Sequence, residues 1–525
     1  MSARARTALV SLALALASFL ALLAWGLSSP VGSAPDDDFH LASMWCPPPI
    51  EQSGCELFYE QGRVAGVYVP ELVGRPNCFA FRPRVTGACQ ESLSTTALVT
   101  TVRVDQGEYP GPYYRFAHLF VGDNIHASVL GLRAFNAALA VVLIGAAALL
   151  TQWRLRSGLA WAIGAAIVPM AMFLVPSVNP SSWAFSGLTA FWISCFALAR
   201  STTTRHRLAA AAVAITGAVV ALVARNDSFL YVVLALAATT VLYAPIPGQR
   251  TGADRRTVAR GVLPWVAVAG VALGVGLWSF LTAASSTGIL PDESRATRDP
   301  WAVFSYNLLE SLQMPVGLLG FAQLGWNDVR PPALVYVTSI AITSFVLLTG
   351  MRELSPRKLL AVVGVGGTFV VLPIVMLQRA LAYVGDQVQA RYFMSVLPLL
   401  IGVALLSGDG RRALRFGRIQ SVFVWGGLTM ANSVMLLLNI RRYSVGTAGT
   451  YFPGPDADWW WPVGPSPLGL WAIGTIAFAL GSLVLVLASG GTGYRRDLVG
   501  TVPVRGAAAG AIGPRTAPGA EASEY

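Results

Sequence analysis

The sequence predicts an all-α polytopic membrane protein with about twelve transmembrane helices. Of its 525 residues, 54% are hydrophobic and only 12% are charged, and the mean hydropathy is +0.59. Soluble domains carry roughly 25% charged residues, so a water-soluble fold is not expected. Apolar runs recur along the chain, and basic residues collect in alternate segments between them, as in multi-pass membrane proteins.

The apolar runs give the expected spans. A transmembrane helix needs about 17–25 largely apolar residues, and twelve runs approach or reach that length: 8–28, 127–150, 158–176, 181–199, 208–224, 228–244, 261–283, 333–350, 359–377, 392–407, 420–440 and 466–488. They predict one transmembrane domain over residues 1–488. The remaining residues, 489–525, are rich in Gly, Ala and Pro and are expected to form a disordered cytoplasmic tail.

The distribution of charge predicts the orientation. If the N-terminus is cytoplasmic, the cytoplasmic segments hold 22 Lys and Arg residues and 6 acidic residues. The rest of the chain holds 15 Lys and Arg residues and 20 acidic residues. This positive-inside pattern predicts a multi-pass plasma-membrane protein with both termini in the cytoplasm. It also accounts for the net charge of +11, so membrane lipids, and not nucleic acid, are the expected partners. A signal peptide cut near Ala34 is an alternative for the first run, and it too exports the following segment.

The first extracytoplasmic loop, residues 29–126, contains four of the five cysteines. Exported cysteines usually form disulfides, and of the three pairings we favour the local ones, Cys46–Cys55 and Cys78–Cys89, because short loops close most easily. Short helices and irregular structure are expected around them. The second long extracytoplasmic loop, residues 284–332, has an apolar stretch interrupted by Pro315, which is typical of an interfacial or re-entrant helix.

An acidic run opens the first loop. Asp36, Asp37 and Asp38 follow closely after the first span, and adjacent carboxylates raise one another's pKa unless cations or donors compensate. Carboxylates at a membrane surface can act as a general base or hold a divalent cation, and His40 could orient one of them. A solvated charge run is the alternative.

Further polar and aromatic residues lie where spans meet the extracytoplasmic side. Tyr109 belongs to a Pro-rich aromatic turn that could line a lipid or sugar site, although an interfacial aromatic belt is the alternative. Arg133, Arg225 and Arg391 lie at helix ends. A guanidinium matches phosphate through paired hydrogen bonds, whereas arginines that only snorkel to the interface are the alternative.

Several short motifs in order resemble one known family. They are Pro35-Asp36-Asp37-x-x-His40, Tyr109-Pro110, Asn179-Pro180, Arg225-x-Asp227 and Gln389-x-Arg391-Tyr392. In these motifs the chain resembles the actinobacterial members of a bacterial membrane-protein family called domain of unknown function 2142. That family in turn looks like a branch of the GT-C glycosyltransferase superfamily. The sequence departs from the family pattern at Asp37, Gly111 and Ala390, where Glu, Pro and Gly are usual.

The resemblance implies a GT-C-like fold and a polyprenyl-phosphate-linked sugar as donor. Asp36 or Asp37 would then be the catalytic acid that deprotonates an acceptor hydroxyl on an envelope glycan or lipid, or that holds a divalent cation. Asp38 is not part of the family pattern and would be a bystander. The implied substrate-binding residues are His40, Tyr109, Arg133, Arg225, Asp227 and Arg391. A lipid or polysaccharide transporter and a degenerate scaffold are the competing hypotheses.

Overall fold

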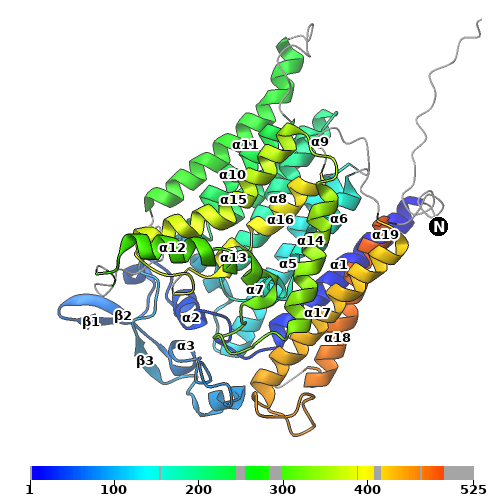
Figure 1. The fold of residues 1–525 in the computed structure, drawn as a ribbon. Helices are drawn as coiled ribbons and strands as arrows, with labels where there is room; N and C mark the ends of the chain where they lie inside the picture. Colours follow the sequence, from blue (N-terminus) through cyan, green and yellow to red (C-terminus); the bar gives the residue numbers. More distant parts are fainter. Residues whose placement is uncertain are drawn as a thin grey trace, which may run out of the picture.

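The structure, a computed structural model, describes residues 3–152, 155–243, 255–282, 295, 297–386, 388–406, 416–461 and 464–489. The predicted tail from residue 490 and the first part of the second long loop lie outside these described residues. Figure 1 shows a bundle of long helices with a small sheet and several short helices packed at one end. We call this end the loop end.

Eight helices of the described residues are long and apolar enough to cross a membrane. They are α1 (Ala3–Leu27), α5 (Ile125–Leu150), α8 (Ser181–Ala199), α9 (Thr204–Leu222), α14 (Ala333–Gly350), α15 (Pro356–Arg379), α17 (Arg418–Ser444), and α18 (Pro467–Ser482) continued by α19 (Val484–Ser489). Each coincides with a predicted apolar run. The chain is therefore a mostly helical, multi-pass membrane protein.

The other four predicted runs form shorter or interrupted helices. Three of them correspond to single helices: α10 (Ser228–Tyr243), α11 (Arg255–Thr282) and α16 (Val396–Leu405). In α11 the apolar part is Leu263–Trp278. The fourth run is divided between α6 (Arg156–Ala166) and α7 (Pro169–Leu174). A total of twelve spans therefore stays a prediction.

The break between α6 and α7 has a local cause. Val168 has φ −80° and ψ 164°, an extended conformation, because a residue that precedes proline is sterically disfavoured in the α region. Pro169 then begins α7, where its missing N–H is tolerated. Two short helices replace the single helix that the hydropathy of residues 158–176 predicted.

The first loop contains a sheet, which corrects the all-α prediction. Strands β1 (Leu57–Glu60), β2 (Arg63–Pro70) and β3 (Leu98–Thr101) pair antiparallel in the order β1-β2-β3. Val67 and Val69 flank Tyr68 in β2 and point to the same face of the sheet, where both are buried. A Cβ on Gly66 would lie 2.0 Å from the carbonyl oxygen of Thr101, so glycine permits the close approach of β3.

Short helices complete the first loop: α2 (Asp37–Trp45), α3 (Glu71–Gly74) and α4 (Gly111–Ala117). The apolar side chains of the sheet, α2 and α3 form a small core of their own, which extends to the first turns of α5. The loop is therefore a folded cap on the bundle.

The predicted extracytoplasmic segments gather at the loop end. Trp326 of the second long loop donates to the carbonyl of Gly32 at 2.9 Å, and Asn226, in the turn between α9 and α10, donates to the carbonyl of Glu108 at 3.0 Å. The predicted cytoplasmic turns meet at the opposite end, where Gln152 donates to the carbonyl of Arg200 at 2.7 Å. Successive connections thus lie at alternate ends of the bundle, as a multi-pass topology requires.

The described part of the second long loop contains two short helices, α12 (Pro300–Glu310) and α13 (Gln313–Val316). Large apolar side chains of this region are exposed, including Trp301 at 75% and Leu309 at 81%. Exposed apolar side chains on a short helix beside a bundle are typical of a helix that lies in the membrane interface.

Candidate functional site

The site is built around a tight turn at Asp36. This residue has φ 60° and directly precedes α2. Aspartate is one of the few non-glycine residues that adopt the left-handed region at modest cost. Its carbonyl oxygen accepts the N–H groups of Phe39 and His40, both at 3.0 Å. The turn therefore fixes the carboxyl group of Asp36 relative to the first turn of α2.

The Asp36 carboxylate lies between two arginines. Arg391 Nη2 donates to Oδ2 at 2.8 Å, and Arg103 Nη2 lies 3.3 Å from Oδ1. The Asp36 side chain nevertheless remains 39% exposed. Burial acts to raise the pKa of Asp36, but the opposing positive charges, led by Arg391, outweigh burial and lower it. Asp36 is thus an anion that is paired with cations and still accessible.

Arg103 is held in place by Asp38. Arg103 Nε and Nη2 donate to the two carboxylate oxygens of Asp38 at 3.0 and 3.1 Å. Such paired bonds fix the plane of a guanidinium, so Asp38, which the family pattern does not include, holds a neighbour of Asp36 in place. Sequence reasoning missed Arg103, because it lies just after β3 and the sequence gives no sign that β3 folds back onto α2.

Asp37, the second predicted catalytic acid, points into the protein. Its side chain is fully buried, Oδ2 accepts the N–H of Ala34 at 3.1 Å, and Oδ1 has no hydrogen-bond partner among the described residues. Burial raises the pKa of Asp37 to about 7 against the opposing charge of Arg133, whose Nη2 lies 3.9 Å away. The structure therefore exposes Asp36 and buries its neighbour.

Arg133 is also buried, with only 2% of its side chain exposed. Its guanidinium donates to the carbonyl oxygens of Gly26 and Ser29 at 2.8 Å and to that of Pro30 at 2.9 Å. These bonds satisfy carbonyls that the end of α1 leaves free. Arg133 was predicted to contact substrate, whereas its position here is that of a clamp on the segment after α1.

His40 lies beneath Asp36 in an aromatic pocket. It is 1% exposed, its Nδ1 lies 2.7 Å from Tyr114 Oη, and its ring centre is 5.4 Å from that of Tyr109. Burial lowers the pKa of His40 to about 3 and raises that of Tyr109 to about 12. Both side chains are therefore neutral at physiological pH. His40 Nε2 is buried and has no hydrogen-bond partner in the part of the chain that the structure describes.

Arg225 and Asp227 form a second charged pair at the loop end. Arg225 Nε and Nη2 donate to the two oxygens of Asp227, both at 2.9 Å, and Nη1 donates to Ser181 Oγ at 3.2 Å. The Arg225 guanidinium lies 4.9 Å from the ring centre of Tyr392 and 6.0 Å from that of Tyr109. Arg225 therefore faces the aromatic side chains that also border Asp36 and His40.

Tyr392 links the two arginines. Its ring centre is 5.2 Å from the guanidinium of Arg391, and its carbonyl accepts the hydroxyl of Tyr231 at 3.1 Å. The predicted motif Gln389-x-Arg391-Tyr392 thus places two site residues in one turn, η6 (Ala390–Phe393). The loop-end site consists of Asp36, Asp38, His40, Arg103, Tyr109, Arg225, Asp227, Arg391 and Tyr392.

A small recess adjoins the loop-end site. It is lined by residues that include Pro35, Asn327, Gln389 and Arg391. Asn179, from the predicted Asn179-Pro180 motif, donates to the carbonyl of Pro35 at 3.1 Å. Arg391 therefore borders both the recess and the Asp36 carboxylate.

Asp36 and Asp37 do not form a common cation site. The Asp36 carboxylate is paired with two guanidinium groups, whereas that of Asp37 points to Ala34 and Arg133. Among the described residues, no three His, Cys, Asp or Glu side chains lie close enough to hold a metal ion. Divalent cations need several convergent oxygen ligands. The Asp36 and Asp37 carboxylates do not converge in this way, so they do not fit the divalent cation that was considered for them.

Both predicted disulfides are present. Cys46 pairs with Cys55 and Cys78 with Cys89, which confirms the local pairing, and Cys195 is buried and free. The second disulfide closes a segment, residues 78–89, that carries exposed residues at positions 81–84.

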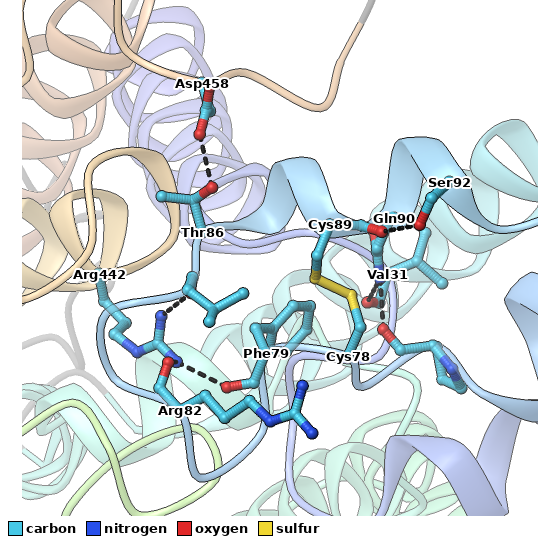
Figure 2. Close-up of a disulfide and its surroundings, with 12 residues drawn as sticks. Val31, Cys78, Phe79, Arg82, Thr86, Cys89, Gln90, Ser92, Arg442 and Asp458 are labelled. Carbon is cyan, nitrogen blue, oxygen red and sulfur yellow. Dashed lines mark hydrogen bonds between the residues drawn. A yellow bond between two sulfur atoms is a disulfide. The ribbon is translucent and has the colours of Figure 1, made fainter.

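Arg442, in the last turn of α17, fastens the 78–89 segment to the bundle. Its guanidinium donates to the carbonyl oxygens of Phe79 at 2.9 Å and Val85 at 2.6 Å, and Figure 2 shows it beside the segment, with Phe79 between it and the Cys78–Cys89 disulfide. The same guanidinium forms a buried ion pair with Asp328 at 2.6 Å. One side chain thus joins the first loop, the second loop and a spanning helix.

The comparisons with known proteins agree with this architecture. No curated protein and no solved structure matches the chain. A family model described as predicted membrane protein, DUF2142, matches residues 19–400. This range includes every residue of the loop-end site and well over half of the chain. The protein therefore belongs to the DUF2142 family of predicted membrane proteins.

Proposed function

We propose that this protein is a glycosyltransferase that uses a polyprenyl-phosphate-linked sugar at the extracytoplasmic membrane face, in the assembly of envelope glycans. One observation carries the proposal: an accessible carboxylate, Asp36, lies 2.8 Å from Arg391 at the membrane-proximal end of a folded loop. Transfer from a lipid phosphate needs a base for the acceptor and cations for the departing phosphate. The loop-end site brings both together, because the Arg391 guanidinium contacts the Asp36 carboxylate although the two residues lie 355 positions apart in the chain.

In the proposed reaction, the Asp36 carboxylate accepts the proton of an acceptor hydroxyl. The acceptor oxygen forms a bond to the anomeric carbon of the sugar, and the bond from that carbon to the phosphate oxygen breaks with its electron pair. Polyprenyl phosphate leaves with one more negative charge than it carried in the donor, and Asp36 is left protonated, so negative charge moves from the Asp36 carboxylate to the phosphate. Arg225 and Arg391, whose guanidinium groups lie 4.9 and 5.2 Å from the ring centre of Tyr392, would stabilise this charge.

The pairing of Asp36 with Arg391 suggests how donor binding would activate the base. In the free protein this pairing lowers the pKa of Asp36, which makes the carboxylate a weak base. A donor phosphate competes for the same guanidinium. When Arg391 turns to the phosphate, Asp36 loses one cation and its pKa rises, so the acceptor is deprotonated only when donor is present.

His40 and Asp38 act as positioning residues in this proposal. Neutral His40 lies next to Asp36 along α2 and is fixed by Tyr114 at 2.7 Å, so it keeps the floor of the site rigid without adding charge. Asp38 holds Arg103 through two hydrogen bonds. Because Arg103 is tied to Asp38, Asp36 retains one cationic neighbour after Arg391 has moved.

The proposal is tested by glycan and lipid profiling of a deletion strain that carries wild-type protein, Asp36→Asn or Asp123→Asn. Asparagine tolerates the left-handed conformation of residue 36, and Asp123 is an exposed aspartate of the same loop. We expect wild type and Asp123→Asn to restore one glycan or glycolipid and Asp36→Asn to leave it missing, with equal amounts of protein in the membrane. Full restoration by Asp36→Asn would contradict the proposal.

A further inference from the structure

A second site lies at the end of the bundle opposite to the loop end. Here α1, α5, α6, α7 and the α18–α19 pair leave an apolar cleft of about 440 Å³. Ligand pockets commonly measure roughly 300–1,000 Å³. Its lining consists largely of Ala, Leu, Ile, Val, Met and Phe, and among the residues that the structure describes the one charged side chain in this lining is Arg156, at the start of α6.

The depth of the cleft matches one leaflet of a bilayer. On α5 the lining extends from Ala140 to Leu149, a rise of about 14 Å at 1.5 Å per residue. The hydrocarbon core of a bilayer is about 30 Å thick. The cleft therefore spans about half of the core, from near its middle to the turn that joins α5 and α6.

Arg156 lies at the end of the cleft nearest the turn between α5 and α6. Its Nε and Nη2 donate to the carbonyl oxygens of Thr151 at 3.0 Å and Leu149 at 2.9 Å. No carboxylate of the described residues forms an ion pair with it. A fixed guanidinium above an apolar cleft between spanning helices is the arrangement that recognises an anionic lipid headgroup.

We propose that this cleft binds one acyl chain of an anionic phospholipid, with the lipid phosphate on Arg156. The occupant is a bilayer lipid because the spans that form the cleft are surrounded by lipid. The residues that follow Ser489 are a poorer fit, since Arg495, Arg496 and Asp497 come early and the later apolar stretches are interrupted by Gly, Pro and Arg. The inference does not rest on the proposed function, because the two sites lie at opposite ends of the bundle.

The test uses full-length protein in vesicles of phosphatidylcholine and phosphatidylglycerol, with a phosphatidylglycerol that carries a photoreactive group in its acyl chain. Mass spectrometry then maps the labelled peptides. We expect labelling within residues 140–149 and 156–167 to exceed that on the outer surface of α15 by at least about tenfold, as expected for a defined pocket over bulk lipid contact. This measurement on wild type does not depend on the folding of any variant.

Variants separate the chain contact from the headgroup contact. Gly145 lines the cleft and Gly364 lies on the exposed side of α15, and an added Cβ meets nothing within 4 Å at either position. We expect Gly145→Leu to abolish the excess labelling and Gly364→Leu to preserve it. Arg156→Gln should keep the labelling but remove the preference for phosphatidylglycerol over an equally photoreactive phosphatidylcholine.

Three results would overturn the inference. One is labelling of the cleft in wild type that is no stronger than on α15. Another is equal labelling in Gly145→Leu and Gly364→Leu. The third is a severalfold rise in cleft labelling after truncation behind Ser489, which would show that the C-terminal residues occupy the cleft in the intact chain.

Discussion

At the residue scale, environment separates two adjacent aspartates of identical chemistry. Asp36 is accessible and paired with cations that lower its pKa, whereas Asp37 is buried and its pKa is raised to about 7. The sequence identified both acids as candidates but could not distinguish them. Which of the two faces outward depends on the left-handed turn at residue 36 and on Arg133, which lies 96 positions after Asp37 in the chain.

The buried carboxyl of Asp37 makes a prediction about pH and stability. Its pKa in the folded protein, about 7, lies above the ordinary value of 3.8, so the folded state binds this proton more tightly than the unfolded state. The stability that it contributes is full below about pH 4 and is lost as pH rises through about 7. Between those limits, the melting temperature of wild type in detergent should fall with rising pH more steeply than that of Asp37→Asn.

The control for this comparison is Asp123→Asn, since Asp123 is exposed in the same loop. Its melting curve should keep the wild-type pH dependence. If Asp37→Asn also keeps the wild-type slope between about pH 4 and pH 7, Asp37 does not titrate in that range as its burial requires.

At the element scale, hydropathy located the helices but not their interruptions or the sheet. Pro169 divides one apolar run into α6 and α7. Hydropathy averaged over a window of residues does not detect such a break. The strands β1 and β3 have only four residues each, too few for alternation to be distinguished from a loop. The disulfides were predictable because the pairing in each case closes a short segment, of 9 and 11 residues.

The contacts of Arg103 and Arg442 were not predicted, because they join elements that are far apart in the sequence. Arg103 meets Asp38 across 65 residues, and Arg442 meets Phe79 across 363. Both contacts depend on how the cap packs on the bundle. Local spacing carries no information about such pairs, whereas Arg225 and Asp227 are two residues apart and their pairing follows from a single turn.

Arg442 gives a prediction about the 78–89 segment. Replacement by leucine leaves Asp328 as a buried unpaired charge, and breaking such a pair costs about 3–5 kcal/mol. We expect Arg442→Leu to open the segment, so that trypsin cleaves after Arg84 at least about tenfold faster. Limited proteolysis of the purified protein measures this.

Arg418→Leu is the control. Arg418 is an exposed arginine at the first residue of α17, at the opposite end of the helix from Arg442. Cleavage after Arg84 should stay at the wild-type rate in this variant. Equal rates in the two variants would show that Arg442 does not hold the segment.

At the scale of the whole molecule, the structure and the charge distribution describe the same topology. The basic turns predicted to be cytoplasmic meet at one end, and the cap with the loop-end site lies at the other. The positive-inside pattern predicts that the loop end faces the extracytoplasmic side.

Cysteine labelling in intact cells tests this assignment. Asp123 and Thr202 are exposed and lie at opposite ends of the bundle, and the native cysteines are paired or buried. A membrane-impermeant maleimide should label Asp123→Cys in intact cells and Thr202→Cys only after lysis. The reverse pattern would place the loop-end site in the cytoplasm and exclude the proposed extracytoplasmic reaction.

The central claim is that Asp36 is the base of a sugar transfer from polyprenyl phosphate. The most direct measurement is the rate at which membranes containing the protein convert polyprenyl-phosphate-linked sugar to polyprenyl phosphate in the presence of envelope acceptors. Loss of a general base typically lowers the rate roughly 10²- to 10⁴-fold, so Asp36→Asn should fall by that factor while Asp123→Asn stays at the wild-type rate. Equal rates in wild type, Asp36→Asn and a strain without the protein would contradict the claim.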